Sequence, residues 1–342
     1  MEYIINKIQQ DQFIATYNSD TARRHARYSL DWFEYWIKSS VFFSQITQDN
    51  IYQVLQGFVK FLEGQKVINE DCKIKLYDPG TIADPFASVT VKAYMGYLRT
   101  YLAQLGIKTD DREYRRLVRF QKPLHELKYT PDLSIVQRVI YGITPKYQNY
   151  LVLLLATGAR QSEAIQLKVE DVDLTQTPAS VHFPAQITKT RTERYSFLTK
   201  EAAGFIKNQI AGKQPGDLIF SDLKLGTFRA VWRDLRHRLG FEARYSTGVH
   251  KLTPHRLRAY TNRIIQRESG DAFADVILGH ADGLQSYDVG SLETMRQDYA
   301  KAEPMLTISP ELRNFSQKNT TDRMQAEIDR LKFEIERLKT VV

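Results

Sequence analysis

Two arginines, two histidines and a tyrosine stand in short polar stretches that lie far apart in the sequence. In chain order they are Arg160, His255, Arg258, His280 and Tyr287. A guanidinium matches the geometry of phosphate oxygens and keeps its proton. Histidines transfer protons, and a phenol becomes a nucleophile once nearby positive charge stabilises its oxyanion. Brought together by folding, these side chains can hold a DNA phosphodiester and attack it without a metal ion.

Arg160 has the most distinctive setting, Thr-Gly-x-Arg-x-x-Glu, over residues 157–163. The stretch before it is apolar, so Gly158 is expected to end a helix just ahead of the arginine. Ser162 and Glu163 can cap the helix that follows. An isolated arginine after a glycine would equally suit a cap or a surface position.

The second arginine shares a predicted helix with a histidine. Thr253 is a suitable cap and Pro254 a suitable first residue, so His255 and Arg258 fall at i and i+3 on one face. His280 ends the stretch Leu-Gly-His, where Gly279 is also a plausible helix stop. His-x-x-Arg alone is common, and His280 alone could be an accident of the helix end.

The elements that must position these residues predict a mainly α protein with a small β-sheet. Helical spacing of apolar residues is found in 21–37, 50–62 and 88–105, and helices are expected again over 226–239, 253–267 and 271–278. Residues 181–198 alternate apolar and polar around a turn and predict a β-hairpin. We divide the chain into a helical first domain (1–120), a linker (121–129), a second domain (130–315) and a tail helix (316–342); the roles of the two domains, DNA binding and catalysis, are those implied by the family resemblance given below.

The tail carries Ile328, Leu331, Ile335 and Leu338 at alternating steps of three and four, which is a heptad pattern. It predicts a C-terminal coiled-coil helix that pairs with a second copy. The alternative is a helix that docks onto its own catalytic domain.

Charge and composition favour a nucleic-acid partner. The net charge is +8, and residues 224–267 hold eleven Lys or Arg against two acids. We expect nine of the basic residues to contact DNA: Arg112, Arg115, Arg116, Arg119, Arg229, Arg233, Arg236, Lys251 and Arg256. The single cysteine, Cys72, excludes an intrachain disulfide and a cysteine-rich zinc site. Without an apolar run long enough for a bilayer or a signal-peptide pattern, we expect no membrane partner and a cytoplasmic, nucleoid-associated location or the DNA-containing compartment of a host.

The motifs around Arg160, His255, Arg258 and His280 resemble those of the tyrosine recombinase (phage-type integrase) family. The resemblance implies a helical core-binding domain and an α+β catalytic domain that close around duplex DNA. It implies a 3′-phosphotyrosine intermediate, exchange within a tetramer, and no ATP, metal or other cofactor. It further implies that Lys189, in the predicted hairpin turn, protonates the leaving 5′-oxygen, with Lys200 as a rival.

The nucleophile departs from the family spacing. Many members place the tyrosine about nine residues after the last histidine, a position occupied here by Val289. We favour Tyr287 over Tyr299, and its short spacing allows action in cis or in a neighbouring subunit. The alternatives to a recombinase are a type IB topoisomerase-like nicking enzyme, a catalytically silent DNA-binding protein of the same fold, and a coiled-coil structural protein.

Overall fold

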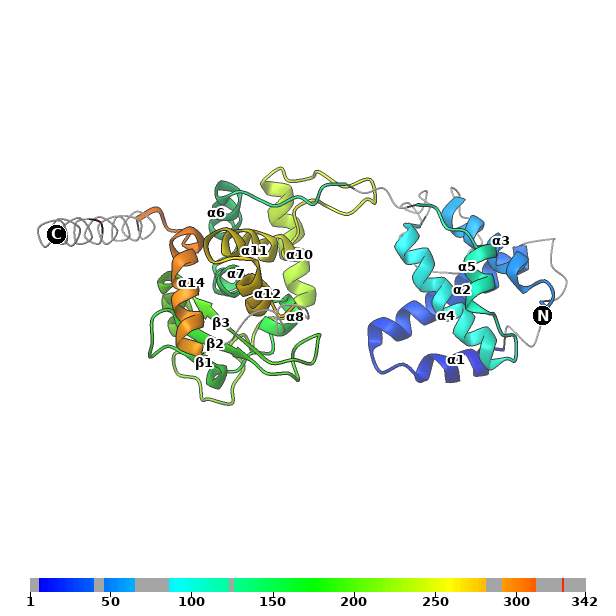
Figure 1. Ribbon diagram of the computed structural model, residues 1–342, viewed down its shortest axis with the longest axis horizontal. Coiled ribbons are helices and arrows are strands. Elements are labelled where there is room, and N and C mark those ends of the chain that lie inside the picture. The colour runs from blue at the N-terminus through cyan, green and yellow to red at the C-terminus, as the bar shows by residue number, and fades with distance from the viewer. Residues whose placement is uncertain are drawn as a thin grey trace, which may run out of the picture. The chain divides into compact units, whose positions relative to one another are not determined.

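The computed structural model of the chain describes residues 6–39, 46–64, 86–122, 126–280, 291–311 and Ile328. It contains two compact units, Met1–Glu126 and Leu127–Val342, which are described separately (Figure 1). The division falls inside the stretch 121–129. The functional roles assigned to the two parts remain predictions.

The described part of the first unit is helical. Its elements are α1 (Lys7–Ala15), α2 (Asp20–Ser39), α3 (Ile51–Gly64), α4 (Ser88–Gln104) and α5 (Asp111–Leu117). Helix α2 packs against α1, α3 and α4, and α3 also contacts α5. The core between them is rich in aromatic residues, among them Trp32, Phe33, Phe58 and Tyr101. The three helices expected from apolar spacing are confirmed, with ends that differ by at most two residues.

The second unit is built around a buried helix. Its helices are α6 (Leu133–Gly142), α7 (Pro145–Thr157), α8 (Gln161–Ala164), α9 (Lys200–Ile210), α10 (Leu225–Arg238), α11 (His255–Ser269), α12 (Asp271–Leu278) and α14 (Leu292–Leu306). Every residue of α7 from Tyr150 to Thr157 is buried. A helix that is apolar on all sides needs neighbours on all sides. Accordingly, α7 contacts α6, α8, α9, α11 and β3 (Figure 1).

A three-stranded antiparallel sheet lies beside these helices. Strand β1 (Val172–Asp173) follows a short 3-10 helix, Val169–Asp171, and pairs with β2 (Ala179–Phe183), which pairs with β3 (Arg194–Leu198). The predicted hairpin is therefore confirmed, with residues 184–193 as its connection. Because side chains alternate along a strand, Arg194 and Ser196 share one face of β3 and Tyr195 and Phe197 the other.

Hydrogen bonds and ring contacts identify what covers each face of β3. The Ser196 hydroxyl donates to the Thr157 carbonyl at the end of α7, whereas the Phe197 ring packs on Tyr299 of α14. The face with Arg194 is therefore turned toward the end of α7, where Arg160 follows.

Several expectations changed at the level of single residues. Helix α11 begins at His255, so Pro254 is its N-cap and not its first residue. Arg160, not Ser162, is the N-cap of α8. Tyr287 and the heptad tail, apart from Ile328, lie outside the described residues. Among the helices that the structure describes, none is long and apolar enough to cross a membrane.

Candidate active site

Arg160 stands at the sharp turn between α7 and α8. Gly158 ends α7 in the left-handed conformation, with φ of 61°, as its place after an apolar helix predicts. The backbone N–H of Arg160 donates to Oε2 of Glu163 over 3.1 Å, and its side-chain Nη1 donates to Oε1 over 2.9 Å. The same carboxylate thus caps α8 and holds the arginine side chain, which remains partly exposed.

Glu163 is fully buried and has a second cationic partner. Nη2 of Arg194, from β3, donates to Oε2 of Glu163 over 2.7 Å. Burial alone would raise the pKa of Glu163, but Arg194 and the bonds from Arg160 outweigh it and the pKa is lowered. The carboxylate therefore stays ionised between two guanidinium groups.

Arg258, on α11, is buried directly behind this turn. Its Nη1 donates to the Gly158 carbonyl and its Nη2 to the Leu278 carbonyl, each over 2.6 Å. Burial, followed by the charges of Arg160 and Arg194, lowers the pKa of Arg258 to about 9. The guanidinium is still charged at neutral pH.

His280 lies against Arg258 just beyond α12. Gly279 ends α12 in the left-handed conformation, and the ring that follows places Nε2 3.2 Å from Nη2 of Arg258. Its Nδ1 is 2.8 Å from Oδ1 of Asp275. Because an arginine only donates, Nε2 of His280 must accept, and the ring proton belongs on Nδ1, facing Asp275. The stretch is therefore a helix end, and its histidine contacts Arg258; the catalytic role of His280 stays a prediction.

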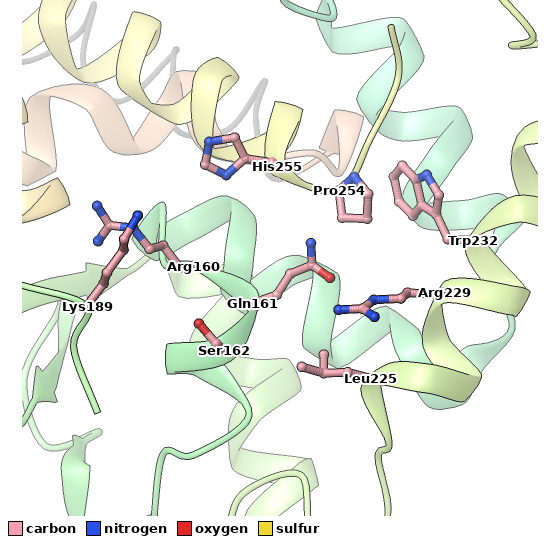
Figure 2. A pocket seen from close by; sticks show the side chains of 9 residues that line it. All are labelled: Arg160, Gln161, Ser162, Lys189, Leu225, Arg229, Trp232, Pro254 and His255. Carbon is pink, nitrogen blue, oxygen red and sulfur yellow. The ribbon is translucent and has the colours of Figure 1, made fainter. Parts of the chain in front are cut away.

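A cavity of about 520 Å³ opens in front of Arg160 (Figure 2). Figure 2 shows Lys189, in the β2–β3 connection, and Arg160 on one side of the cavity, with His255 above them at the start of α11. Helix α10 contributes the opposite wall, including Arg229. The full lining is Arg160, Gln161, Ser162, Lys189, Leu225, Arg229, Trp232, Pro254 and His255.

His255 is surface-exposed yet electrostatically perturbed. Desolvation by the surrounding protein, and then the charge of Arg258, Arg256, Arg160 and Lys128, lower its pKa below its ordinary value of 6.5. The imidazole is therefore neutral at pH 7 and free to accept a proton.

The structure brings five predicted site residues together and leaves one undescribed. Arg160, Lys189 and His255 line the cavity. Behind it, Arg258 bonds to the Gly158 carbonyl in the turn before Arg160, and also to His280. Tyr287 falls within the undescribed segment 281–290. Tyr299, the alternative nucleophile, is fully buried, and its hydroxyl donates to the Ala156 carbonyl over 2.8 Å.

The residues expected to contact DNA differ in exposure. Arg229 lines the cavity, and Arg233 is exposed beside Asp234. Arg236 is mostly buried near Glu242. Lys251 and Arg256 each lie 5.6 Å from the centre of the Tyr245 ring. In the first unit, the four arginines on or just after α5 are exposed: Arg112, Arg115, Arg116 and Arg119.

Sequence reasoning missed two residues that shape this site, Arg194 and Asp275. Glu163 was identified as a motif position and a cap, but not as the carboxylate between two arginines. Arg194 could have been found as a charged residue at an inward-facing position of a mostly buried strand. Asp275 could have been found as a carboxylate about one helical turn before His280. Among the described residues, no three His, Cys, Asp or Glu side chains gather as a metal site requires.

Comparison with known proteins gives consistent matches. Residues 134–285 match the phage integrase family. The chain is 28% identical over 227 residues to tyrosine recombinase XerA of Saccharolobus solfataricus, covering 63% of this chain and 68% of that protein. It is 29% identical over 195 residues to tyrosine recombinase XerC of Bacillus subtilis, covering 54% of this chain and 60% of that protein. A lambda integrase tetramer bound to a Holliday junction shares the fold, with a TM-score of 0.55 and 14% identity over 85% of this chain and 80% of that one.

Proposed function

Because residues 134–285 match the phage integrase family and the relatives are tyrosine recombinases, we propose that the chain is a tyrosine recombinase that cleaves and rejoins duplex DNA at specific sites. The observation that carries this proposal is the meeting of two arginines at one turn. Arg258 binds the carbonyl of Gly158, and Arg160 follows two residues later. A phosphodiester in front of this turn is within the field of both guanidinium groups.

The charge balance of the site suits an anion that becomes more negative during reaction. Three guanidinium groups, of Arg160, Arg194 and Arg258, are balanced by only two carboxylates, those of Glu163 and Asp275. The excess positive charge is fixed by the fold before DNA arrives. Pre-organised charge of this kind stabilises a phosphoryl transition state without a reorganisation cost.

The proposed reaction gives each proton-handling group one role. The Tyr287 oxygen attacks phosphorus, the bond from phosphorus to the 5′-oxygen breaks, and a 3′-phosphotyrosine forms. His255, neutral at pH 7, accepts the phenol proton, and Lys189 donates a proton to the leaving 5′-oxygen. The reverse reaction with a new 5′-hydroxyl rejoins the strand. The burial of Tyr299 supports Tyr287 as the nucleophile.

The partner is duplex DNA, and the acting form is a homo-oligomer. The matched lambda integrase structures include a tetramer on a Holliday junction, which supports a tetramer here. We assign DNA binding to the helical first unit and catalysis to the second. We expect the protein to be located in the cellular compartment that contains its DNA substrate. The heptad tail either pairs with a second copy or docks onto its own catalytic unit.

A trapping experiment with randomised DNA tests the function and identifies the cleavage site at the same time. The protein is incubated with nicked suicide duplexes of randomised sequence, and covalent adducts are recovered under denaturing conditions. We expect mass spectrometry to place the adduct on Tyr287, and the recovered DNA to be enriched in one sequence.

Controls separate the alternatives. Tyr287→Phe and Arg258→Ala should give no adduct. An adduct on Tyr299 would refute the assigned nucleophile, and adducts without sequence enrichment, together with relaxation of supercoils, would favour a topoisomerase. If the native chain forms no adduct with any duplex, a catalytically silent DNA-binding protein becomes the favoured alternative.

A further inference from the structure

Arg194 is a buried arginine that belongs to none of the sequence motifs. It begins β3, and only 2% of its side chain is exposed. The guanidinium lies 4.1 Å from the centre of the Phe183 ring, its partner across the β2–β3 ladder. Nε donates to the Ile277 carbonyl over 3.0 Å, and Nη2 donates to Glu163 over 2.7 Å. No part of this side chain reaches the cavity lining.

These bonds connect β3 to both segments that carry the site. Glu163 is the carboxylate that holds the backbone and side chain of Arg160. Ile277 immediately precedes Leu278, whose carbonyl binds Arg258. A charged side chain without access to solvent therefore lies between the two groups expected to bind the phosphate.

We propose that Arg194 is a positioning residue for DNA cleavage, acting through Glu163 on Arg160. Oε1 of Glu163 accepts from the Arg160 guanidinium, whereas Oε2 accepts from Arg194 and from the Arg160 backbone N–H. The Arg160 guanidinium is therefore held through one Nη atom, and the side chain lines the cavity. Without Arg194, Glu163 would draw the Arg160 fork onto both of its oxygens, because an ionised buried carboxylate recovers its lost bond from the nearest cation. Arg160 would then be withdrawn from the phosphate. The inference rests on the proposed recombinase function.

Gly279 gives independent support for a fixed Arg194. A Cβ placed on Gly279 would lie 2.9 Å from Cδ of Arg194, so the backbone at the end of α12 approaches this side chain closely. Glycine at this position therefore meets two requirements, the left-handed turn and the space for Arg194. The Arg194 side chain therefore packs directly against the backbone at the end of α12.

The chain offers a matched control for a purely structural role. Arg296 of α14 is also buried, donates to Glu293 over 3.1 Å and to the Pro178 carbonyl, and lies 5.5 Å from the centre of the Phe197 ring. None of these partners lines the cavity or bonds to Arg160 or Arg258. Replacing Arg296 thus removes the same kinds of bond from the same unit at a different place.

The first test separates DNA binding from the rate of cleavage. Arg194→Met, Arg194→Lys and Arg296→Met are compared by Kd for DNA and by single-turnover cleavage of a suicide duplex, at a temperature where each variant is folded. We expect Arg194→Met to slow cleavage about 100-fold, the scale of a catalytic group misplaced by about 1 Å, with Kd changed less than about threefold. Arg194→Lys should recover part of the rate, since an ammonium can pair with Glu163 but lacks the fork that also reaches Ile277. Arg296→Met should lower the melting temperature and leave the rate within about threefold.

Equal losses of rate in Arg194→Met and Arg296→Met, or an unchanged rate in Arg194→Met, would overturn the proposal. A crystal structure of Arg194→Met gives a second measurement that does not need activity. In that variant the Arg160 guanidinium should bind both oxygens of Glu163, whereas in the native chain it binds Oε1 alone, and an unmoved Arg160 side chain would contradict the mechanism. If the native chain cleaves no DNA at all, the proposed function fails, while the crystal structure still tests the positioning of Arg160.

Discussion

Replacing Gly158 by alanine should damage both stability and cleavage through a steric contact at the centre of the site. Gly158 has φ of 61°, and a Cβ there would lie 2.4 Å from Cδ2 of the buried Leu278. The left-handed conformation costs a residue with a Cβ about 1–2 kcal/mol. Overpacking of a buried position adds about 1–3 kcal/mol. We therefore expect a loss of about 2–5 kcal/mol in the free energy of unfolding.

Gly212→Ala is the matched control. Gly212 also has a positive φ, of 79°, but no described atom lies within 4 Å of a Cβ placed on it. It should therefore incur only the backbone cost. At about 2–4 °C per kcal/mol for a domain of about 150–250 residues, the control should melt about 2–8 °C lower than the native chain, and Gly158→Ala about 4–20 °C lower.

The assay is thermal unfolding followed by circular dichroism, together with cleavage of a suicide duplex at about 25 °C. Cleavage should fall at least about tenfold in Gly158→Ala, because the Gly158 carbonyl that binds Arg258 must shift with the displaced Leu278. Gly212→Ala should cleave normally. Equal melting shifts in the two variants would refute the close packing of Gly158 on Leu278, and normal cleavage by a destabilised Gly158→Ala would refute the role of this turn in placing Arg258.

Two further predictions concern proton transfer and the choice of tyrosine. His255 has a pKa below 6.5, so it is neutral at pH 7 and becomes charged only as the pH falls further. The single-turnover cleavage rate of the native chain, measured across a range of pH, should therefore drop on the acid side. His255→Gln should lose this pH dependence, and its rate at pH 7 should be about 10²–10⁴-fold lower. Tyr299→Phe leaves the buried Ala156 carbonyl without its donor and should cost about 1–3 kcal/mol by urea unfolding. The same variant should form the covalent DNA adduct at a normal rate, and loss of the adduct would return Tyr299 to consideration.

The sequence was sufficient where a local pattern decides the structure. Helix α12 spans the predicted residues because Gly270 and Gly279 bound an apolar stretch, and α7 ends at Gly158 because no other residue there adopts a left-handed turn so readily. The strands of the hairpin follow from alternation. Each of these features depends on neighbours within a few positions of the chain.

The charge network of the site depends on distant pairs and was not predictable in the same way. His255 and Arg258 were expected to share one helix face, yet His255 lines the cavity while Arg258 is buried behind it. Arg258 lies where α11 packs against the ends of α7 and α12, which supply its two carbonyl acceptors. The alternation of β3 indicates on which side Arg194 lies, but not that Glu163 lies opposite it. That pairing arises from the packing of β3 on the end of α7, which no local pattern encodes.

The way Arg258 is held has a consequence for the choice of side chain at this position. Its Nη atoms already make bonds to two backbone carbonyls and to a histidine, yet a guanidinium carries more N–H groups than these three bonds consume. We expect an incoming phosphate to bind these spare donors, so that the three existing bonds stay intact when the substrate arrives. A lysine in its place would exhaust its ammonium hydrogens on the same three acceptors. A positive charge alone is therefore not sufficient at position 258, because the side chain also needs N–H donors beyond those bound by the three protein acceptors.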